Sequence, residues 1–183
     1  MAEAPLEEAA RGKDVEFEWL PFELRPYPNP TLRPEGEYLQ RAWRDSVYPL
    51  AEKLGVDIRL PQVSPQPYTH LAHEGMLFAK EHGKANEYNH AVMKAFFQKS
   101  EDIGNPDVLA RIAGEVGLNE EEFCRALENP RYRQTHHQLL REAYELGITA
   151  VPTFFIGRRR LQGLYPKEVL GEIIEEELSA FNQ

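Results

Sequence analysis

The sequence offers one sulfur nucleophile, Cys124, in 183 residues. A single cysteine forms no disulfide within the chain and supplies neither a CxxC redox motif nor a cysteine-based zinc cluster. Cys124 lies in NEEEFCRALE, a segment that predicts a helix, beside Phe123, Ala126 and Leu127. A free cysteine in such apolar surroundings usually packs as a small hydrophobic side chain. We therefore expect Cys124 to be a buried structural residue, and we predict no catalytic residue in this chain.

Histidines are the next candidates, because neutral imidazole is a common metal ligand. His70 and His73 lie three residues apart, a spacing that places both side chains on one helix face. No third ligand is evident near them, so we favour solvation or helix capping as their role. His136 and His137 are adjacent and point to different helix faces, which keeps them from sharing an ion. The sequence therefore predicts no metal site.

Charged runs near the end of the chain have simpler interpretations. The arginines at 158–160 could bind an anionic group such as a carboxylate. Charged residues at a hairpin tip also protect strand edges from unwanted pairing, and we favour this role. The glutamates at 172 and 175–177 are expected to form the solvated face of the last helix. Neither a phosphate-binding glycine loop nor a serine nucleophile elbow is present.

The sequence predicts β-strands near its two ends, and these strands would position such residues. Val15, Phe17 and Trp19 alternate with glutamates, the period of a strand with one buried face. TFFIG and RLQG predict two further short strands around a tight turn, followed by a helix from Pro166. Three short strands cannot form two stable sheets, so we expect one sheet that contains them all.

Helical patterns fill the sequence between these strands. PLEEAAR, from Pro5, predicts the last turns of a short helix, and a proline-rich connector follows the first strand. Pro49 predicts a kink in the helical pattern that ends at Gly55. Further helices are predicted over 70–82, 86–99, from the cap Asn105 to Gly117, from the cap Asn119 onward, and from about 132 to Gly147.

The net charge and the apolar content of the sequence exclude some classes of binding partner. The formal net charge of −9 and the pI near 5.2 argue against a nucleic-acid or anionic-membrane partner, because the protein's field repels phosphate. No stretch approaches the roughly 20 apolar residues of a membrane span. The first residues, MAEAPLEEAARGKD, are acidic where a secretory signal has a positive start and an apolar run. We expect a cytoplasmic protein.

Several segments together carry a family resemblance. GITAVPTFFIGRRRLQGLYPKEVL, at 147–170, resembles the closing half of a thioredoxin fold, with a cis-proline, a strand, a tight turn, a second strand and a final helix. VEFEWLPFELRP, VSPQPYTHLAH and DIGNPDVLARIAGEVGL, in that order, resemble the FrnE-like branch of the DsbA family, thioredoxin-fold proteins with a helical insertion. The similarity spans the chain from about Pro5 to Leu178.

The resemblance implies an α/β protein with a thioredoxin-like fold and a large all-helical insertion. The thioredoxin-like domain would be incomplete and would comprise 1–36 and 147–183, while 37–146 would form the insertion. In the family, the first β-strand and the CxxC motif precede the helix that ends here near Arg11, so both would lie before Met1. Three explanations stay open: the complete protein begins further upstream, the chain is a redox-inactive descendant, or the family assignment is wrong.

The resemblance also implies where a ligand binds. The backbone of Val151 would pair with an extended peptide or a small thiol, as a strand edge does. Pro152, in the cis form, would lie against a reactive sulfur, with Thr153 following it and Phe22 of PFEL forming a wall. The redox activity needs no cofactor. Glutathione is the implied ligand if the chain instead resembles the kappa-class glutathione transferases and 2-hydroxychromene-2-carboxylate isomerases.

The family activity implied is thiol–disulfide exchange, although this chain lacks the redox cysteines. A redox-inactive peptide-binding module and a glutathione-dependent enzyme remain the alternatives. The strand that this chain lacks is central in the family, and without it two neighbouring strands expose unpaired backbone groups. We therefore expect a homodimer or a rearranged sheet.

Overall fold

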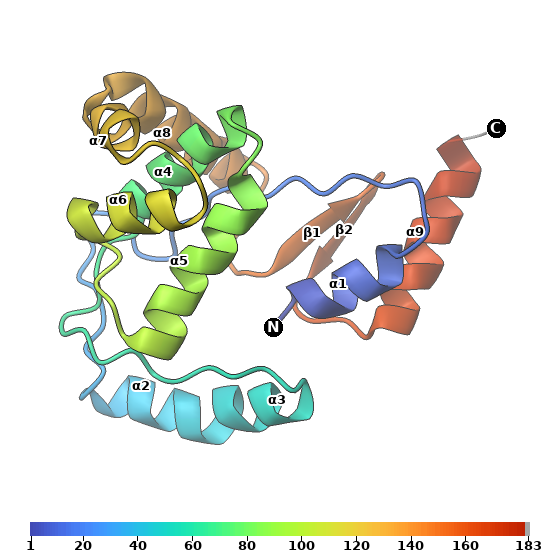
Figure 1. Ribbon diagram of the computed structural model, residues 1–183. Coiled ribbons are helices and arrows are strands. Elements are labelled where there is room, and N and C mark those ends of the chain that lie inside the picture. Colours follow the sequence, from blue (N-terminus) through green and yellow to red (C-terminus); the bar gives the residue numbers. More distant parts are fainter. Residues whose placement is uncertain (182–183) are drawn as a thin grey trace. The chain divides into compact units, whose positions relative to one another are not determined.

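The computed structural model describes residues 1–181. It contains two compact units, one formed by Met1–Glu18 together with the chain from Ala143 onward, and the other by Trp19–Glu142. The first unit holds a two-stranded sheet and the second is helical (Figure 1). The expected α/β class with a large helical part is confirmed. Residues 19–36 belong to the helical unit here, and the domain boundaries that the resemblance implied stay a prediction.

The sheet of the first unit is a single hairpin. β1 (Thr153–Ile156) pairs antiparallel with β2 (Arg159–Gln162), and Phe154 lies opposite Leu161. The turn between the strands contains Gly157 at φ 55°, in the left-handed region that glycine adopts without steric cost. Both predicted strands and their tight turn are therefore confirmed.

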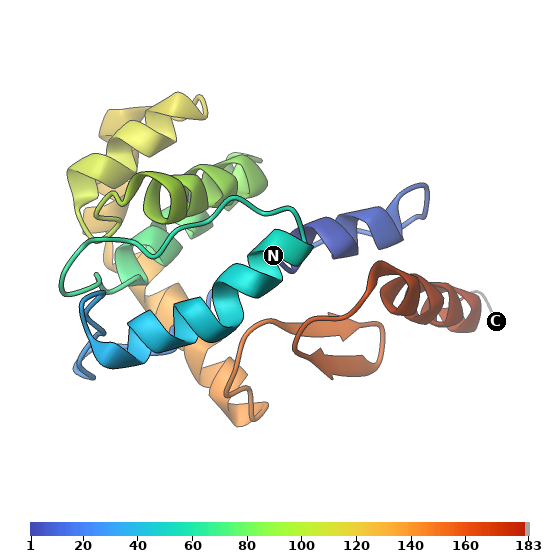
Figure 2. The same cartoon turned by 90° about the horizontal axis from the view of Figure 1, so that it is seen from below.

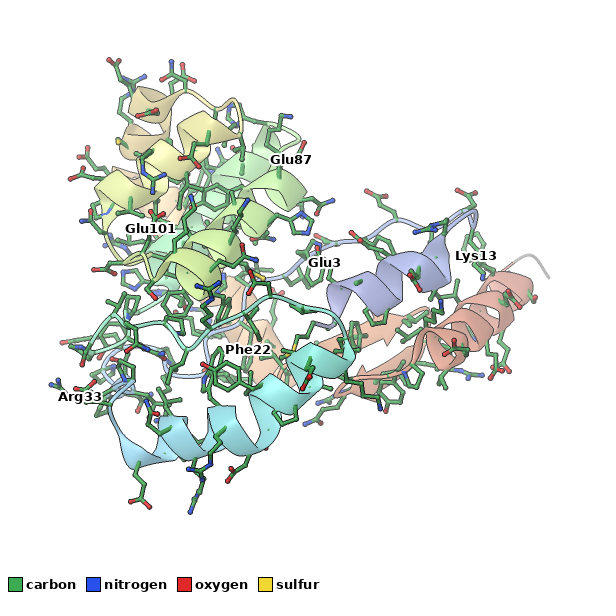
Figure 3. The ribbon with its side chains drawn as sticks, turned by 60° about the horizontal axis from the view of Figure 1, so that its bottom comes forward. Glu3, Lys13, Phe22, Arg33, Glu87 and Glu101 are labelled. Carbon is green, nitrogen blue, oxygen red and sulfur yellow. The ribbon has the colours of Figure 1, made fainter. Side chains whose placement is uncertain are left out.

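Helices α1 (Glu3–Ala10) and α9 (Lys167–Phe181) pack together and supply the core of this unit. Figure 2 shows the short segment that joins the hairpin to α9. Lys13 follows the end of α1 (Figure 3), and its Nζ lies 2.9 Å from Oε1 of Glu175 on α9. The core side chains come from both helices and the hairpin: Leu6, Ala9, Ala10, Leu170 and Ile174, with Phe154, Ile156 and Leu161 packed against them.

The strand predicted at 15–19 does not form. The segment is extended, and burial alternates along it as predicted, with Val15, Phe17 and Trp19 half-buried and the glutamates between them exposed. Val15 and Phe17 pack against the core of the first unit. No strand within residues 1–181 pairs with the segment, so it has the side-chain pattern of a strand without the backbone ladder. The expected three-stranded sheet is therefore a two-stranded one in the described part of the chain.

The first helix of the helical unit is continuous over three segments and contains one π-helical turn. α2 (Glu37–Ala42) continues through a π-helical turn, η1 (Trp43–Val47), into α3 (Tyr48–Lys53) (Figure 2). Pro49 has no N–H to donate to the carbonyl four residues earlier, and its ring displaces that carbonyl. The irregularity that Pro49 predicts therefore takes the form of a π-helical turn directly before it.

Five further helices follow: α4 (His70–Glu81), α5 (Ala85–Lys99), α6 (Pro106–Glu115), α7 (Glu120–Glu128) and α8 (Pro130–Glu145). The predicted caps are in place. Oδ1 of Asn105 accepts a hydrogen bond from the Asp107 N–H at 2.9 Å, and Oδ1 of Asn119 accepts one from the Glu122 N–H at 2.9 Å. Gly117, which closes α6, has φ 87°. Local sequence signals therefore decide where these helices begin and end.

The main core lies among α4, α5, α6 and α7. Its fully buried side chains include Met76, Tyr88, Leu109, Ile112 and Phe123. Burying a side chain of this size contributes roughly 1.5–3 kcal/mol, so this cluster dominates the stability of the helical unit. Among the described residues, no helix is both long and apolar enough to span a bilayer.

Candidate functional site

The loop between α8 and β1 contains an exposed residue, Val151, whose backbone groups are not hydrogen-bonded within residues 1–181. Val151 is 50% exposed, and within residues 1–181 its N–H and C=O take part in no hydrogen bond. The Val151–Pro152 peptide bond is cis. The Pro152 carbonyl accepts a hydrogen bond from the Gly163 N–H at 2.8 Å, which ties the loop to the end of β2. Val151 therefore offers one donor and one acceptor beside an anchored proline.

Arg160 of β2 fixes the beginning of this loop. Its Nη1 donates to the Leu146 carbonyl at 2.6 Å and its Nη2 donates to the Gly147 carbonyl at 2.8 Å. Carbonyls at the end of a helix carry partial negative charge and lack partners within the helix, so a guanidinium suits them well. Arg160 thus links the end of α8 to the hairpin, on the approach to Val151.

The other two arginines of the run contact α9. Arg159 forms ion pairs with Glu176 and Glu177, and the backbone N–H of Arg158 donates to Oε2 of Glu177 at 2.9 Å. The guanidinium groups of Arg159 and Arg160 therefore both have partners inside the first unit. This arrangement agrees with a role in holding the hairpin rather than in binding an anion.

The remaining predicted binding residues lie in different places. The Thr153 hydroxyl donates to the Ala150 carbonyl at 2.7 Å, so Thr153 braces the loop from within. Phe22 is half-buried and belongs to the helical unit (Figure 3), and its role as a wall beside Val151 stays a prediction. The structure therefore groups Val151, Pro152 and Thr153 in one loop.

A buried polar cluster in the helical unit was not foreseen from the sequence. Nε2 of His136 on α8 lies 2.8 Å from Oε1 of Glu23, and the two side chains are 0% and 4% exposed. The ring of His73 on α4 stacks on the His136 ring, with 5.4 Å between centroids and 24° between planes. Glu74 is fully buried, and its Oε1 lies 3.9 Å from Nε of Arg133. Two helices and one extended segment meet at this cluster.

Burial and charge shift the protonation equilibria of the cluster. Burial lowers the pKa of His73 to about 4, and the nearby positive charge of His136 acts in the same direction. Burial also lowers the pKa of His70 and raises that of Glu74. For Glu23, burial alone would raise the pKa, but the hydrogen bond and charge of His136 outweigh it and the net shift is downward. Near pH 7, Glu23 is therefore ionised and His73 is neutral.

These findings correct one histidine expectation and confirm another. His73 is half-buried, and its ring stacks on His136 rather than facing solvent alone or capping a helix. His136 and His137 do point to different faces, the first buried and the second exposed. The signal for His136 was its place on the buried stripe of α8 with Tyr132 and Leu140. Nothing local marks Glu23, whose partner lies 113 residues away.

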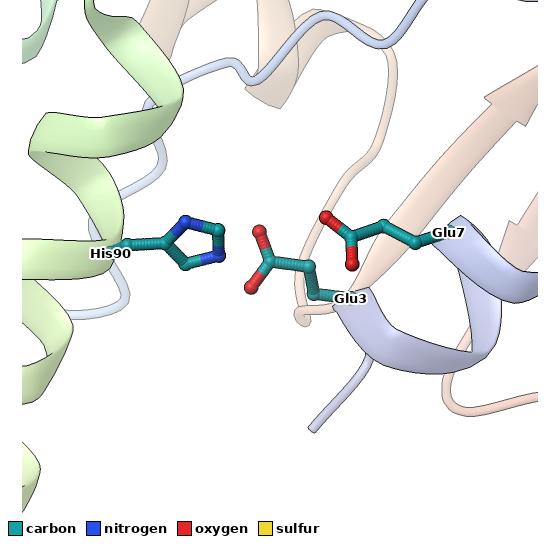
Figure 4. Close-up of side chains that lie close together, drawn as sticks. All are labelled: Glu3, Glu7 and His90. Carbon is teal, nitrogen blue, oxygen red and sulfur yellow. The ribbon is translucent and has the colours of Figure 1, made fainter.

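We assign no catalytic or metal-binding role to two further groups, Cys124 and the pair of Glu3 and Glu7. Cys124 packs against the main core as expected, but it is only partly buried rather than fully buried. Glu3 and Glu7 lie four residues apart on α1 and project toward the same side of that helix (Figure 4). Acidic pairs of this kind are common at helix surfaces, and we assign no metal site to them.

Comparison with known proteins agrees with this fold. The model of the DSBA-like thioredoxin domain matches residues 1–175. An uncharacterized protein of Bacillus subtilis (strain 168), YwbO, is 50% identical over 179 residues, which is 97% of this chain and 90% of the relative.

Solved structures show the same fold at lower identity. A probable DsbA oxidoreductase from Streptomyces coelicolor matches 97% of this chain and 83% of its own, with TM-score 0.79 and 22% identity. The cytosolic disulfide reductase DsbM from Pseudomonas aeruginosa, solved with GSH, matches 100% of this chain and 91% of its own, with TM-score 0.59 and 21% identity. The chain therefore belongs to the family of DSBA-like thioredoxin domains.

Proposed function

We propose that this chain binds extended thiol or disulfide peptides at Val151, as the substrate-binding part of a DsbA-like thiol–disulfide oxidoreductase. The observation that carries the proposal is the exposed residue Val151, whose backbone donor and acceptor have no hydrogen-bond partner within residues 1–181. An extended peptide could add to it as a strand adds to a sheet edge. Membership of the DSBA-like family supports a sulfur-containing ligand.

The exchange reaction itself needs cysteines other than Cys124. A thiolate must attack the disulfide, and a second thiol must resolve the mixed disulfide that results. The sequence holds one cysteine, on α7 in the helical unit. The proposal therefore assigns ligand binding to this chain and leaves exchange to a cysteine pair outside its 183 residues.

Glutathione binding is the second candidate. The Pseudomonas aeruginosa neighbour was solved with GSH and matches the whole of this chain, which favours testing the same ligand. That protein is described as cytosolic, and this supports a cytoplasmic location as part of the proposal. The order of the sequence segments quoted above supports placement in the FrnE-like branch.

Amide chemical shifts can test where the ligand binds. We would titrate the 15N-labelled chain with an S-methylated cysteine peptide of about eight residues and, separately, with glutathione. The Val151 amide signal should move with the peptide, because its N–H gains an acceptor. If glutathione alone moves it, the second candidate replaces the first. No movement with either probe would reject both.

A pair of variants sharpens this test. Val151→Pro removes the N–H, while Val151→Ala keeps it and shortens the side chain. We expect the proline variant to lose peptide binding and the alanine variant to keep it, with the amide signals of β1 unchanged in both. Equal affinity of the two variants would overturn the backbone-pairing proposal.

An insulin-reduction assay tests the assignment of exchange chemistry. The 183-residue chain should not reduce insulin, because it has one thiol. Reduction that disappears in the Cys124→Ser variant would show that Cys124 is redox-active and would contradict the proposal.

A further inference from the structure

The buried cluster described above holds an extended segment of the helical unit in place. Residues 19–24 contain no helix or strand, and they carry Phe22 and Glu23. Glu23 bonds to His136 of α8, and the His73 ring of α4 makes a hydrogen bond with the Phe22 backbone. We infer that Glu23, His73 and His136 form a pH-sensitive latch that fastens residues 19–24 to α4 and α8 and releases them in acid.

The charged groups around the latch can balance the positive charge of one imidazolium at most. The segment contributes Glu23, α4 contributes His70, His73 and Glu74, and α8 contributes Arg133, His136 and His137. Arg133 already faces Glu74, with 3.9 Å between Nε and Oε1. Among the described residues, Glu23 is therefore the carboxylate that is left to balance a charge on the stacked histidine rings. A second imidazolium would be buried without a counter-charge, which is unfavourable.

The hydrogen bonding of His136 ties it to the segment through one ring nitrogen. Its Nε2 is committed to Glu23, and its buried Nδ1 has no hydrogen-bond partner within the described residues. Among the described residues, His136 is therefore hydrogen-bonded to the segment through Glu23 alone.

Acid acts on the latch mainly through His73. The closed latch holds the pKa of His73 at about 4, whereas a solvated histidine has a pKa of about 6.5. Protons therefore favour the open form as the pH falls through this window. The ratio of open to closed latch should rise by up to about tenfold for each pH unit lost.

Tryptophan indole signals report the latch without any substitution. The chain has two tryptophans: Trp19 lies at the start of the segment, and Trp43 lies in a separate core cluster with Leu39 and Leu60. Between pH 7.5 and 4, the Trp19 indole N–H signal should shift with a midpoint between about 4 and 6.5. The Trp43 signal should stay in place over the same range. Simultaneous shifts of both indoles would indicate general unfolding and would overturn the inference.

Variants identify the group that titrates. His73→Gln keeps an N–H donor for the Phe22 backbone but cannot gain a charge, and we expect it to abolish the Trp19 transition. The control, His137→Gln, removes an exposed histidine from the next position of α8 and should leave the transition unchanged. If the His73 variant does not fold, the ring signal of His73 in the unsubstituted protein decides. It should move with the same midpoint as Trp19, and a different midpoint would reject the latch.

Discussion

Arg160 donates from Nη2 to the Gly147 carbonyl at 2.8 Å, so the second strand of the hairpin holds the end of the preceding helix. The same guanidinium donates from Nη1 to the Leu146 carbonyl at 2.6 Å. Four residues after Gly147 comes Val151, whose backbone we propose as the ligand-binding edge. The hairpin thus sets the starting point of the loop that presents the site.

Replacing Arg160 should loosen this loop more than it destabilises the fold. We expect Arg160→Gln to lower the free energy of unfolding by about 1 kcal/mol, because both bonds are solvent-exposed. The Val151 amide signal should broaden or shift while the β1 amide signals stay in place. Arg160→Lys is the matched control, since it keeps the charge but cannot reach both carbonyls with one planar group. It should recover the stability only in part. An unchanged Val151 signal in Arg160→Gln would contradict the role.

Glu23 should matter far more to stability than an exposed glutamate. Its carboxylate is 4% exposed and accepts from His136, so Glu23→Ala leaves a buried imidazole without its partner. The expected loss is about 3 kcal/mol in urea unfolding. Glu16→Ala, at an exposed position, should change stability by less than about 0.5 kcal/mol. Similar losses in the two variants would show that the Glu23–His136 pair contributes nothing.

The pH dependence of unfolding follows from His73. Its pKa is about 4 in the folded protein and about 6.5 when unfolded, so the unfolded state binds the extra proton in between. The stabilising effect of the neutral ring is fully present above pH 6.5 and falls by about 3 kcal/mol on acidification to pH 4. Glu23 adds to the loss at lower pH, because its lowered pKa stabilises the fold only while it is ionised. His73→Gln should flatten the profile between pH 6.5 and 4. A profile as steep as that of the unsubstituted protein would contradict the assignment to His73.

Local chemistry made much of the fold predictable. Asn105 and Asn119 cap helices because their side chains reach nearby N–H groups, and this depends on neighbouring residues alone. The hairpin follows from two short apolar strands around Gly157. The loop of Val151 and Pro152, in contrast, was predicted from the resemblance of residues 147–170 to the closing half of a thioredoxin fold.

Features that depend on distant residues were missed. The segment at 15–19 has the alternation of a strand, but a strand also needs a partner, which the side-chain pattern does not reveal. The role of Glu23 depends on its hydrogen bond to His136, which lies 113 residues away. The role of His73 depends on its stacking on the same His136 ring. A histidine on an apolar helix stripe marks burial, yet it does not identify the group that it bonds to.

The open edges of the first unit predict self-association. Phe17 of the extended segment and Phe154 of β1 pack against the same core, and no third strand within residues 1–181 joins the sheet. A two-stranded sheet is marginal alone, and unpaired backbone groups favour pairing with another chain. We therefore expect a homodimer, with a mass by light scattering of twice 21.1 kDa. Phe155→Lys places a charge on β1 and should weaken the dimer at least about tenfold. Met93→Lys, at a similarly exposed position of α5, should leave it unchanged. A monomer at every concentration would reject the prediction, because the edges would then be stable without a partner.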